Sequence, residues 1–594
     1  MGLHDLADTN GDGTGEPQPA ERPDSDRAVL DRLRDWPAGD WQRCSSCQCV
    51  LHRTTWARSH GVCPACEKTR RLSAAERIAQ LADADSFTEH LAGLRSTDPL
   101  EFTDSVPYKA RLRKARTATD ASEAVVIGTA RVGGRPVVLL VMDFGFLGGS
   151  MGVVVGEKVV AAADLAVERG EPLVAVSCSG GARMQEGMYS LLQVTRACDA
   201  IRRLNDANVP YVSVLTDPVY GGVAASFASL GDVILAEAAT RSGFAGPRVI
   251  AQALGERLPA DFQTAEFLHT HGHVDLVVPR PALPGVLNRV LTCLTGRPVP
   301  GSMPLPEVTG LPEAPAVATP DRQGGSAWDA VRLARHPARP NVFDHVAGIF
   351  DDFVELHGDR HTGDDPAVAG GLARWGEVGF VVLGHAKEHD PVRAGERNFG
   401  MPHPSGFRKA TRLLRLAGRL GLPVVTFVDT PGAYAGRRAE EGNQSGAIAE
   451  TLLTASGVPV PLVSVVIGEG GSGGALALAA GDALLAMNNS YFSVISPEGC
   501  AAILHGDASR APEAAEALRL RATDLHAAGL VDRLVPEPAG GAQTDPPAAV
   551  RLVKAALRAC LAEFGTLRPE ALLTRRDHRL RTRGASADAV RAEQ

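Results

Sequence analysis

The sequence has no apolar run near the roughly 20 residues that a membrane-spanning helix needs, which excludes a helical integral membrane protein. The N-terminus is polar and acidic and lacks the basic-then-apolar order of a signal peptide, so we expect a cytoplasmic protein with no membrane association. Cysteines are scarce, with 10 in 594 residues, and four of them are clustered. This usage argues against a disulfide framework and fits a reducing compartment with one metal site.

Several binding signatures are also missing. The net charge of −8 argues against a dedicated nucleic-acid-binding protein. There is no G-x-x-x-x-G-K-[ST] loop, and neither glycine-dense stretch, 145–152 or 468–474, reads G-x-G-x-x-G with an acidic residue at the expected distance. A calcium-like run begins at Asp8, but its twelfth position is Pro19, where a bidentate Glu is needed. Nucleotide and calcium binding are therefore not favoured.

The chain is too long for one core, so we expect three or four folding units. Composition and periodicity divide it at Pro- and Gly-rich or polar stretches. The expected parts are a disordered arm (1–40), a cysteine module (41–70), a first domain (71–299), a linker (300–325), a second domain (326–574) and a frayed tail (575–594).

Apolar runs alternate with helical periodicity in both large domains. Such alternation predicts an α/β architecture with largely parallel strands. We expect strands at 137–142, 173–176, 211–215, 378–383, 424–428 and 463–467, and helices at 155–168, 184–204, 411–420, 446–456 and 476–480.

Two C-x-x-C pairs, Cys44 with Cys47 and Cys63 with Cys66, are separated by 15 residues. Each pair places two thiolates on one tight turn, and two such turns complete a closed tetrahedral zinc site. The alternatives are reduced cysteines without metal or a redox pair, and Cys49 could compete as a ligand. Eight basic residues surround the cysteines, so nucleic-acid contact is possible, although a solvated basic face is favoured. These are Arg43, His52, Arg53, Arg58, His60, Lys68, Arg70 and Arg71.

The chemistry centres on the stretch 468–475, Gly-Glu-Gly-Gly-Ser-Gly-Gly-Ala, between a β-branched run and a small-residue helix. A strand that ends in a glycine-dense turn and starts a helix presents free backbone N–H groups. Such a turn can hold a phosphate or an oxyanion that forms during a reaction.

The second domain repeats the first. The run 209–215 parallels 460–466 with a shift of 461 − 210 = 251, and Gly181 matches Gly432 with the same shift, 432 − 181 = 251. Allowing one inserted residue, Gly221 and Gly222 fall on Gly473 and Gly474. The sequence therefore predicts a duplicated α/β domain, each copy with a paired set of glycine turns.

A serine hydrolase is the sharpest competing interpretation, because 470–474 fits G-x-S-x-G between a strand and a helix. His505, His526 and Asp532 could complete a triad with Ser472. In the duplication, however, the counterpart of Ser472 is Tyr220, so glycine rather than serine is the shared feature. The glycines could also serve only helix–strand packing, but that does not explain the repeated set. Oxyanion stabilisation by backbone amides remains.

The first half resembles the β subunit of bacterial acetyl-CoA carboxylase carboxyltransferase, and the second half is similar to the α subunit. The first resemblance rests on the four cysteines and on the motifs at 148–152, 179–186 and 243–248. The second rests on 333–337, 397–401, 429–434, 468–475 and 496–500. The chain looks like the two subunits fused, β first.

This resemblance implies two tandem crotonase-like (ClpP/crotonase) domains that move a carboxyl group from carboxybiotin to acetyl-CoA, giving malonyl-CoA through an enolate. It implies that Gly180 and Gly181 hold the thioester oxygen and that Gly473 and Gly474 hold the biotin ureido oxygen. The further binding residues it implies are Arg183, Gly221, Gly222, Gly246, Gly432, Ala433, Tyr434 and Ala475. Propionyl-CoA is the main rival substrate.

The resemblance also implies partners. One structural zinc ion per chain is expected, and biotin comes on a separate carrier protein served by a biotin carboxylase. The active site of the family lies between a β-type and an α-type domain, so a homodimer is expected.

The long N-terminal helical region usual in the α subunit is missing here, and His385-Ala386-Lys387-Glu388 departs from the family pattern. A zinc-ribbon nucleic-acid-binding protein on an inactive scaffold is the rival of another class.

Overall fold

The computed structural model describes residues 40–256, 258–298, 302–310 and 325–583. The expected disordered arm and the calcium-like run therefore lie outside the described residues, apart from Asp40. The chain separates into two compact units, one through Arg70 and one from Arg71. Within the described ranges, no helix combines the length and the apolar character required to cross a membrane.

The N-terminal unit is a small ribbon built around sulfur. Strands β1 (Trp41–Arg43) and β2 (Val50–His52) pair in antiparallel fashion, and α2 (Arg53–Arg58) follows. Its core consists of Cys44, Trp56 and Cys63. So small a core cannot supply much folding free energy, which is consistent with a module that relies on a bound metal.

The second unit contains two eight-stranded sheets with the same strand order. The first runs β10-β8-β7-β6-β5-β4-β3 with β9 on β7, and the second runs β11-β12-β13-β14-β15-β16-β18 with β17 on β15. In both sheets the first two pairings along the chain are antiparallel and the rest are parallel. The predicted duplicated α/β architecture is confirmed.

The first-sheet strands are β3 (Thr88–His90), β4 (Val125–Val132), β5 (Arg135–Met142), β6 (Leu173–Ser179), β7 (Tyr211–Tyr220), β8 (Val233–Glu237), β9 (Ser242–Gly243) and β10 (Leu276–Val278). The second-sheet strands are β11 (Asp352–Glu355), β12 (Val368–Trp375), β13 (Val378–His385), β14 (Val424–Thr430), β15 (Leu462–Gly471), β16 (Ala483–Met487), β17 (Tyr491–Ser493) and β18 (Arg533–Val535).

The strand register corrects one detail of the predicted duplication. β6 pairs with β7 from Leu173↔Tyr211, and β14 pairs with β15 from Val424↔Leu462. Each strand of the second pair therefore lies 251 residues after its counterpart in the first. β7 and β15 each have ten residues, and no insertion separates them. The counterpart of Ser472 is therefore Gly221 (472 − 221 = 251), not Tyr220. Both residues adopt φ of +57°.

The helix predicted at 476–480 is also placed differently. The glycines are themselves helical, in α17 (Ser472–Leu476), while β15 extends through Gly471. Glycine has poor helix propensity, which is why sequence reasoning assigned this stretch to a turn.

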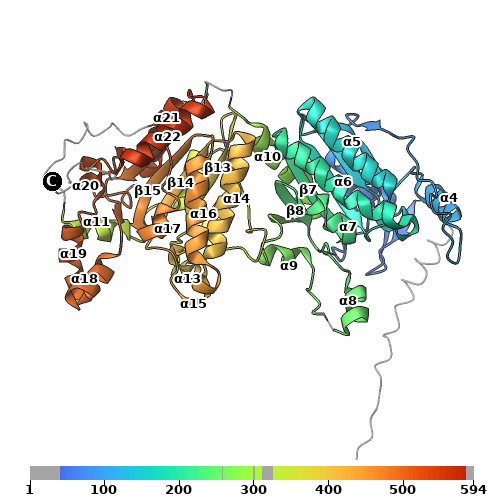
Figure 1. The fold of residues 1–594 in the computed structure, drawn as a ribbon, viewed down its shortest axis with the longest axis horizontal. Helices are drawn as coiled ribbons and strands as arrows, with labels where there is room; N and C mark the ends of the chain where they lie inside the picture. Colours follow the sequence, from blue (N-terminus) through green and yellow to red (C-terminus); the bar gives the residue numbers. More distant parts are fainter. Residues whose placement is uncertain (1–39, 257, 299–301, 311–324, 584–594) are drawn as a thin grey trace, which may run out of the picture. The chain divides into compact units, whose positions relative to one another are not determined.

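Helices cover both faces of each sheet. Figure 1 shows α5 (Val153–Arg169) and α6 (Gly187–Asp206) side by side over the first sheet, and α14 (Pro404–Leu420) and α16 (Gln444–Gly457) over the second. Alternate residues of β5 point to opposite cores, as a strand buried on both faces requires. The remaining helices are α3 (Ala74–Leu81), α4 (Tyr108–Thr119), α7 (Gly221–Ala224), α8 (Pro247–Leu254), α9 (Ala265–Thr270), α10 (Leu283–Thr295), α11 (Ala327–Ala334), α12 (Val342–Ile349), α13 (Pro391–Glu396), α15 (Arg437–Glu441), α18 (Pro497–His505), α19 (Ala511–Leu518), α20 (Ala522–Ala527), α21 (Pro546–Phe564) and α22 (Pro569–Thr582).

Helix α10 belongs to both halves of the second unit. It packs against α3 and β4 of the first half and against β11, β12 and β13 of the second. Its apolar residues join one core cluster with residues of both sheets. Nearby, the buried carboxylate of Asp275 accepts hydrogen bonds from Arg360 and Arg412 of the second half. The two halves are therefore held together by apolar packing and by a buried ion cluster.

The expected linker and tail are more ordered than their composition suggested. Met303 and Leu305, within the expected linker, are buried in the core of the second half. Residues 575–582, expected to be frayed, belong to α22. The charged sequence of α22 concealed this, because Arg576 is fully buried. It pairs with Asp482 at 2.7 Å and donates to the carbonyls of Val458 and Val460.

Arg576→Met is expected to destabilise the protein by about 3–5 kcal/mol, because it leaves the carboxylate of Asp482 buried without its partner. Arg581→Ala, on the same helix, removes an exposed pair with Asp577 and should change stability by less than about 0.5 kcal/mol. Urea unfolding of both variants measures the difference. Equal midpoints would contradict the structural role of Arg576.

Acid sensitivity should arise from His345, which lies fully buried on α12 and stacks on Phe427 with ring centroids 5.5 Å apart. Neither ring nitrogen has a partner among the described residues. Burial, aided by the charge of Arg339, lowers the pKa of His345 to about 3. As pH falls, the unfolded chain therefore takes up a proton at His345 before the folded chain does. The stability that comes from the neutral, buried ring is complete above pH ~6.5 and is lost as pH falls toward ~3, at about 1.4 kcal/mol per pH unit. His345→Phe should reduce that slope in unfolding measurements, whereas His336→Phe, at an exposed site, should not.

Candidate functional site: paired backbone turns and a cysteine cluster

The first turn follows β6 and is fixed by backbone hydrogen bonds. Met151 N donates to Gly181 O, and Arg183 N donates to Met151 O, both at 2.9 Å. Gly181 has φ of +119°, which disfavours a side chain. The strand end is thus bound to the loop that carries the 148–152 glycine motif.

Two amides predicted as oxyanion donors are already used inside the protein. Gly180 N donates to Gly148 O at 2.8 Å, and Gly181 N donates to Ser179 Oγ at 3.0 Å. Both amides are occupied in this conformation, so the structure gives no support to Gly180 and Gly181 as donors, and their role stays a prediction. The N–H of Ala182, next in the chain, has no partner among the residues that the structure describes.

The start of α7 lies against this turn. A Cβ placed on Gly221 would come within 3.0 Å of Gly181 Cα and 3.8 Å of Ala182 N. Gly222 and Val223 occupy the second and third positions of α7, where a helix leaves its N–H groups without intrahelical partners. Ala182, Gly222 and Val223 therefore form a first set of available donors. Predicted residue Gly246 lies close by, since its Cβ would be 3.9 Å from the Tyr220 ring.

The second half repeats this arrangement. Gly432 N donates to Thr430 Oγ1 at 3.0 Å, as Gly181 N does to Ser179. A Cβ on Gly474 would lie only 2.3 Å from Ala433 N, so α17 touches the turn directly. The N–H groups of Gly473 and Gly474 are at the second and third positions of α17 and, with that of Ala433, form a second set of available donors.

Two other predicted binding residues of the second half differ in exposure. Tyr434 is half-buried, and its ring packs on His403 with centroids 4.5 Å apart. Ala475 is fully buried in the core, so its side chain packs inside the domain, and its role in binding stays a prediction. Its small size instead permits the close approach of α17 to β14.

Arg183, also predicted to bind substrate, lies inside the domain. Its side chain is fully buried and bonded to Glu123 at 2.6 Å, to Tyr108 at 3.2 Å and to Ser150 O at 2.8 Å. Burial alone would lower the pKa of Arg183, but the charge and hydrogen bonds of Glu123 outweigh it and raise that pKa. Arg183 therefore holds the first turn and the 148–152 loop in place.

Sequence reasoning did not predict an ion network in the second half, in which two buried carboxylates are paired with half-buried cations. Lys387 Nζ donates to Asp429 at 2.9 Å and to Glu469 at 2.5 Å, and Arg335 donates to Glu469 at 2.5 Å. Burial acts to raise the pKa of Glu469, but Lys387 and Arg335 outweigh it and lower that pKa to about 2. Glu469 thus stays ionised and, through Lys387 and Arg335, connects β15 with β14 and with the residue that follows α11. The acidic residue inside a glycine motif was the signal that could have revealed this network.

Among the described residues, no catalytic triad forms around Ser472. No histidine bonds to its hydroxyl among the described residues; His526 contacts Val531 O through Nδ1, and Asp532 is paired with Arg579 and Arg583. The counterpart in the first half, Gly221, carries no side chain at all. Serine hydrolysis is not supported.

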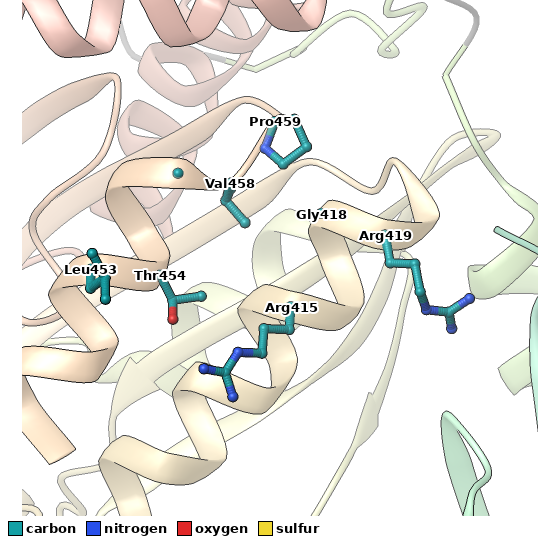
Figure 2. Close-up of a pocket in the computed structure, with 8 residues that line it drawn as sticks. Arg415, Gly418, Arg419, Leu453, Thr454, Val458 and Pro459 are labelled. Carbon is teal, nitrogen blue, oxygen red and sulfur yellow. The ribbon is translucent and has the colours of Figure 1, made fainter. Parts of the chain in front are cut away.

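A surface pocket of about 450 Å³ lies elsewhere, between the C-terminal ends of α14 and α16 (Figure 2). None of the predicted site residues lines it. Arg415 and Arg419 reach it, but they are already paired with Glu450 and Asp232. Backbone turns, rather than this pocket, remain the candidate site.

In the ribbon, the sulfurs of Cys44, Cys47, Cys63 and Cys66 all lie within 4.8 Å of one another. The pairs Cys44–Cys66 and Cys47–Cys63 are 3.6 and 3.7 Å apart. A tetrahedral thiolate site with metal–sulfur bonds of about 2.3 Å requires sulfur separations of about 3.8 Å. The four predicted ligands therefore fit one metal ion.

Known proteins match this arrangement. The family model described as acetyl co-enzyme A carboxylase carboxyltransferase-like matches residues 323–584. The acetyl-coenzyme A carboxylase carboxyl transferase subunits beta/alpha of Salinispora arenicola are 52% identical over 93% of this chain and 98% of the relative, and those of Salinispora tropica are 51% identical over the same shares. The solved transcarboxylase 12S, a hexamer with methylmalonyl-coenzyme A bound, has 22% identity and a TM-score of 0.67 over 92% of this chain and 97% of its own.

Two tandem α/β domains of one topology, together with relatives of this identity and coverage, place the chain among the biotin-dependent carboxyltransferases. The chain belongs to the acetyl-coenzyme A carboxylase carboxyl transferase family, in the form that joins the β and α subunits in one polypeptide.

Proposed function

We propose that this chain moves the carboxyl group of carboxybiotin, held on a separate carrier protein charged by a biotin carboxylase, to acetyl-CoA and so forms malonyl-CoA in the cytoplasm. The observation that carries this proposal is the matched pair of amide sets, related by one shift of 251 residues. A transfer between two carbonyl compounds develops negative charge on an oxygen of each partner, and each set supplies donors for one of them.

The first set, Ala182, Gly222 and Val223, holds the thioester oxygen of acetyl-CoA as it becomes an enolate. The second set, Ala433, Gly473 and Gly474, holds the ureido oxygen of biotin. The biotin nitrogen takes the α-proton once CO2 has left, and the enolate carbon then bonds to CO2. No side-chain nucleophile takes part, which is consistent with a glycine at the first-half counterpart of Ser472.

We infer that two chains assemble, so that a first turn of one chain faces a second turn of the other. Exposed apolar side chains lie next to both turns, and patches of this kind mark interaction surfaces. Beside the first turn they are Met184, Met188, Tyr189, Leu191 and Leu192; beside the second is Leu476, and Val494, Ile503 and Leu504 are exposed elsewhere in the second half. Sedimentation of the full chain at twice its mass is expected.

The test of function is carboxyl transfer from free carboxybiotin, with acetyl-CoA and propionyl-CoA compared at equal concentration. We expect faster turnover of acetyl-CoA, as the names of the relatives indicate. Preference for propionyl-CoA would replace the substrate assignment, and no turnover of either would refute the enzyme.

We propose zinc as the metal of the four-cysteine cluster, with a structural role because four thiolates close the coordination shell. Removing it with a chelator should loosen residues 41–70 and leave the unit from Arg71 folded, because the two units are compact separately. Hydrogen exchange measures both units at once. Cys66→Ser should reproduce the effect and Cys198→Ser should not; loss of protection throughout the chain would contradict the prediction.

A further inference from the structure

A fifth sulfur touches the metal cluster. Cys49 Sγ lies 3.2 Å from Cys47 Sγ and 3.3 Å from Cys63 Sγ, which is closer than the 3.7 Å between those two ligands. The four ligands already satisfy a tetrahedral site, so Cys49 is a thiol in contact with the cluster and outside it.

The backbone fixes Cys49 in this position. Cys44 N donates to Cys49 O at 2.8 Å, and Gln48 N donates to Cys44 O at 3.0 Å. Gln48 adopts φ of +62°, so the chain reverses tightly between Cys47 and Cys49. Cys47 is exposed and Cys49 is half-buried, so a small oxidant reaches Cys47 first.

We propose that Cys49 is a resolving thiol, which converts peroxide oxidation of Cys47 into a reversible Cys47–Cys49 disulfide. The proposal rests on the metal assignment given under the proposed function. The Cys47 thiolate attacks one peroxide oxygen, the O–O bond breaks, and a sulfenic acid and hydroxide form. The Cys49 thiol then displaces the sulfenic hydroxyl as water and forms the S–S bond. The two sulfurs lose two electrons in total, and one hydrogen peroxide becomes one hydroxide and one water.

The cluster then offers three thiolates, from Cys44, Cys63 and Cys66, and holds its metal less tightly. Without a resolving thiol, further peroxide carries a sulfenic acid to the sulfinic acid, which thiol reductants do not reverse. Cys49 therefore makes metal release by peroxide a reversible event. Residues two positions apart can reach the Cα separation of about 4.4–6.8 Å that a disulfide requires.

The experiment treats the full-length protein with hydrogen peroxide, follows zinc with a colorimetric chelator, and then adds dithiothreitol and zinc. Wild type and the control Cys198→Ser should release zinc, show a 47–49 peptide two hydrogen atoms lighter, and regain their zinc on reduction. Cys49→Ser should start with the same zinc content, carry sulfinic acid at Cys47 after oxidation, and fail to regain zinc.

Recovery of zinc by Cys49→Ser, or a disulfide that joins Cys47 to another cysteine, would overturn the proposal. So would Cys49→Ser protein that contains no zinc before oxidation, because Cys49 would then be a ligand. Absence of zinc from the wild type would refute the metal assignment separately, since the peptide masses report on the disulfide by themselves.

Discussion

Gly474→Ala is expected to lower kcat/KM for carboxyl transfer by about 10²–10³-fold, the loss that follows when one preorganised oxyanion donor is displaced. The added Cβ would lie 2.3 Å from Ala433 N and 2.8 Å from the carbonyl carbon of Gly432, both backbone atoms that cannot rotate away. Helix α17 must therefore move from the second turn. The N–H groups of Ala433, Gly473 and Gly474 then no longer converge on one oxygen.

Gly457→Ala is the matched control, because a Cβ there meets no atom within 4 Å at the end of α16. It should retain wild-type kinetics and stability. Circular dichroism and thermal unfolding establish that the Gly474→Ala protein is folded before its rate is compared. Wild-type turnover by folded Gly474→Ala would remove the second donor set from the mechanism.

Arg183→Met should cost about 3–5 kcal/mol of stability or more, since it leaves Glu123 and Glu186 buried together without a cation. Burial raises the free energy of each ionised carboxylate, and the two would also repel each other. The loop of 148–152 would lose the bond from Arg183 to Ser150 O. Both stability and turnover should therefore fall.

Arg202→Ala on α6 provides the comparison, because its pairs with Asp199 and Asp206 are exposed and contribute little. Denaturant unfolding and acetyl-CoA saturation curves are measured for both variants. If Arg183→Met kept its unfolding midpoint and only raised KM for acetyl-CoA, Arg183 would be a substrate contact after all. Reduced stability together with reduced kcat supports the positioning role.

The sequence-based prediction was most accurate for features that depend on short-range or periodic sequence patterns. β-branched runs of five or six residues identified β5, β7, β14 and β15, and the shift of 251 between copies predicted two sheets of one topology. The two C-x-x-C pairs gave four sulfurs that do meet. Motif resemblance located both turns, because the glycines there are required by close backbone approach.

The prediction was weakest where the answer depends on contacts that only the folded chain makes. Whether Gly180 and Gly181 have free amides depends on Gly148 O and Ser179 Oγ, which only the folded turn brings into place. Arg183 was predicted as a binding residue and Arg576 as part of a frayed tail, yet each is buried against a carboxylate at least 60 residues distant. Ala475 illustrates the same limit for burial, since a small residue next to a glycine turn can face either a ligand or the core.

The position of α10 between the two halves has a consequence during synthesis. The first half is complete when α10 leaves the ribosome, but the strands β11, β12 and β13 that cover its second face end at His385. At roughly 5–20 residues per second, the ribosome needs about 5–20 s to make those 90 or so residues. Throughout that interval the nascent chain carries an uncovered apolar stripe, the kind of surface that makes folding intermediates prone to aggregation.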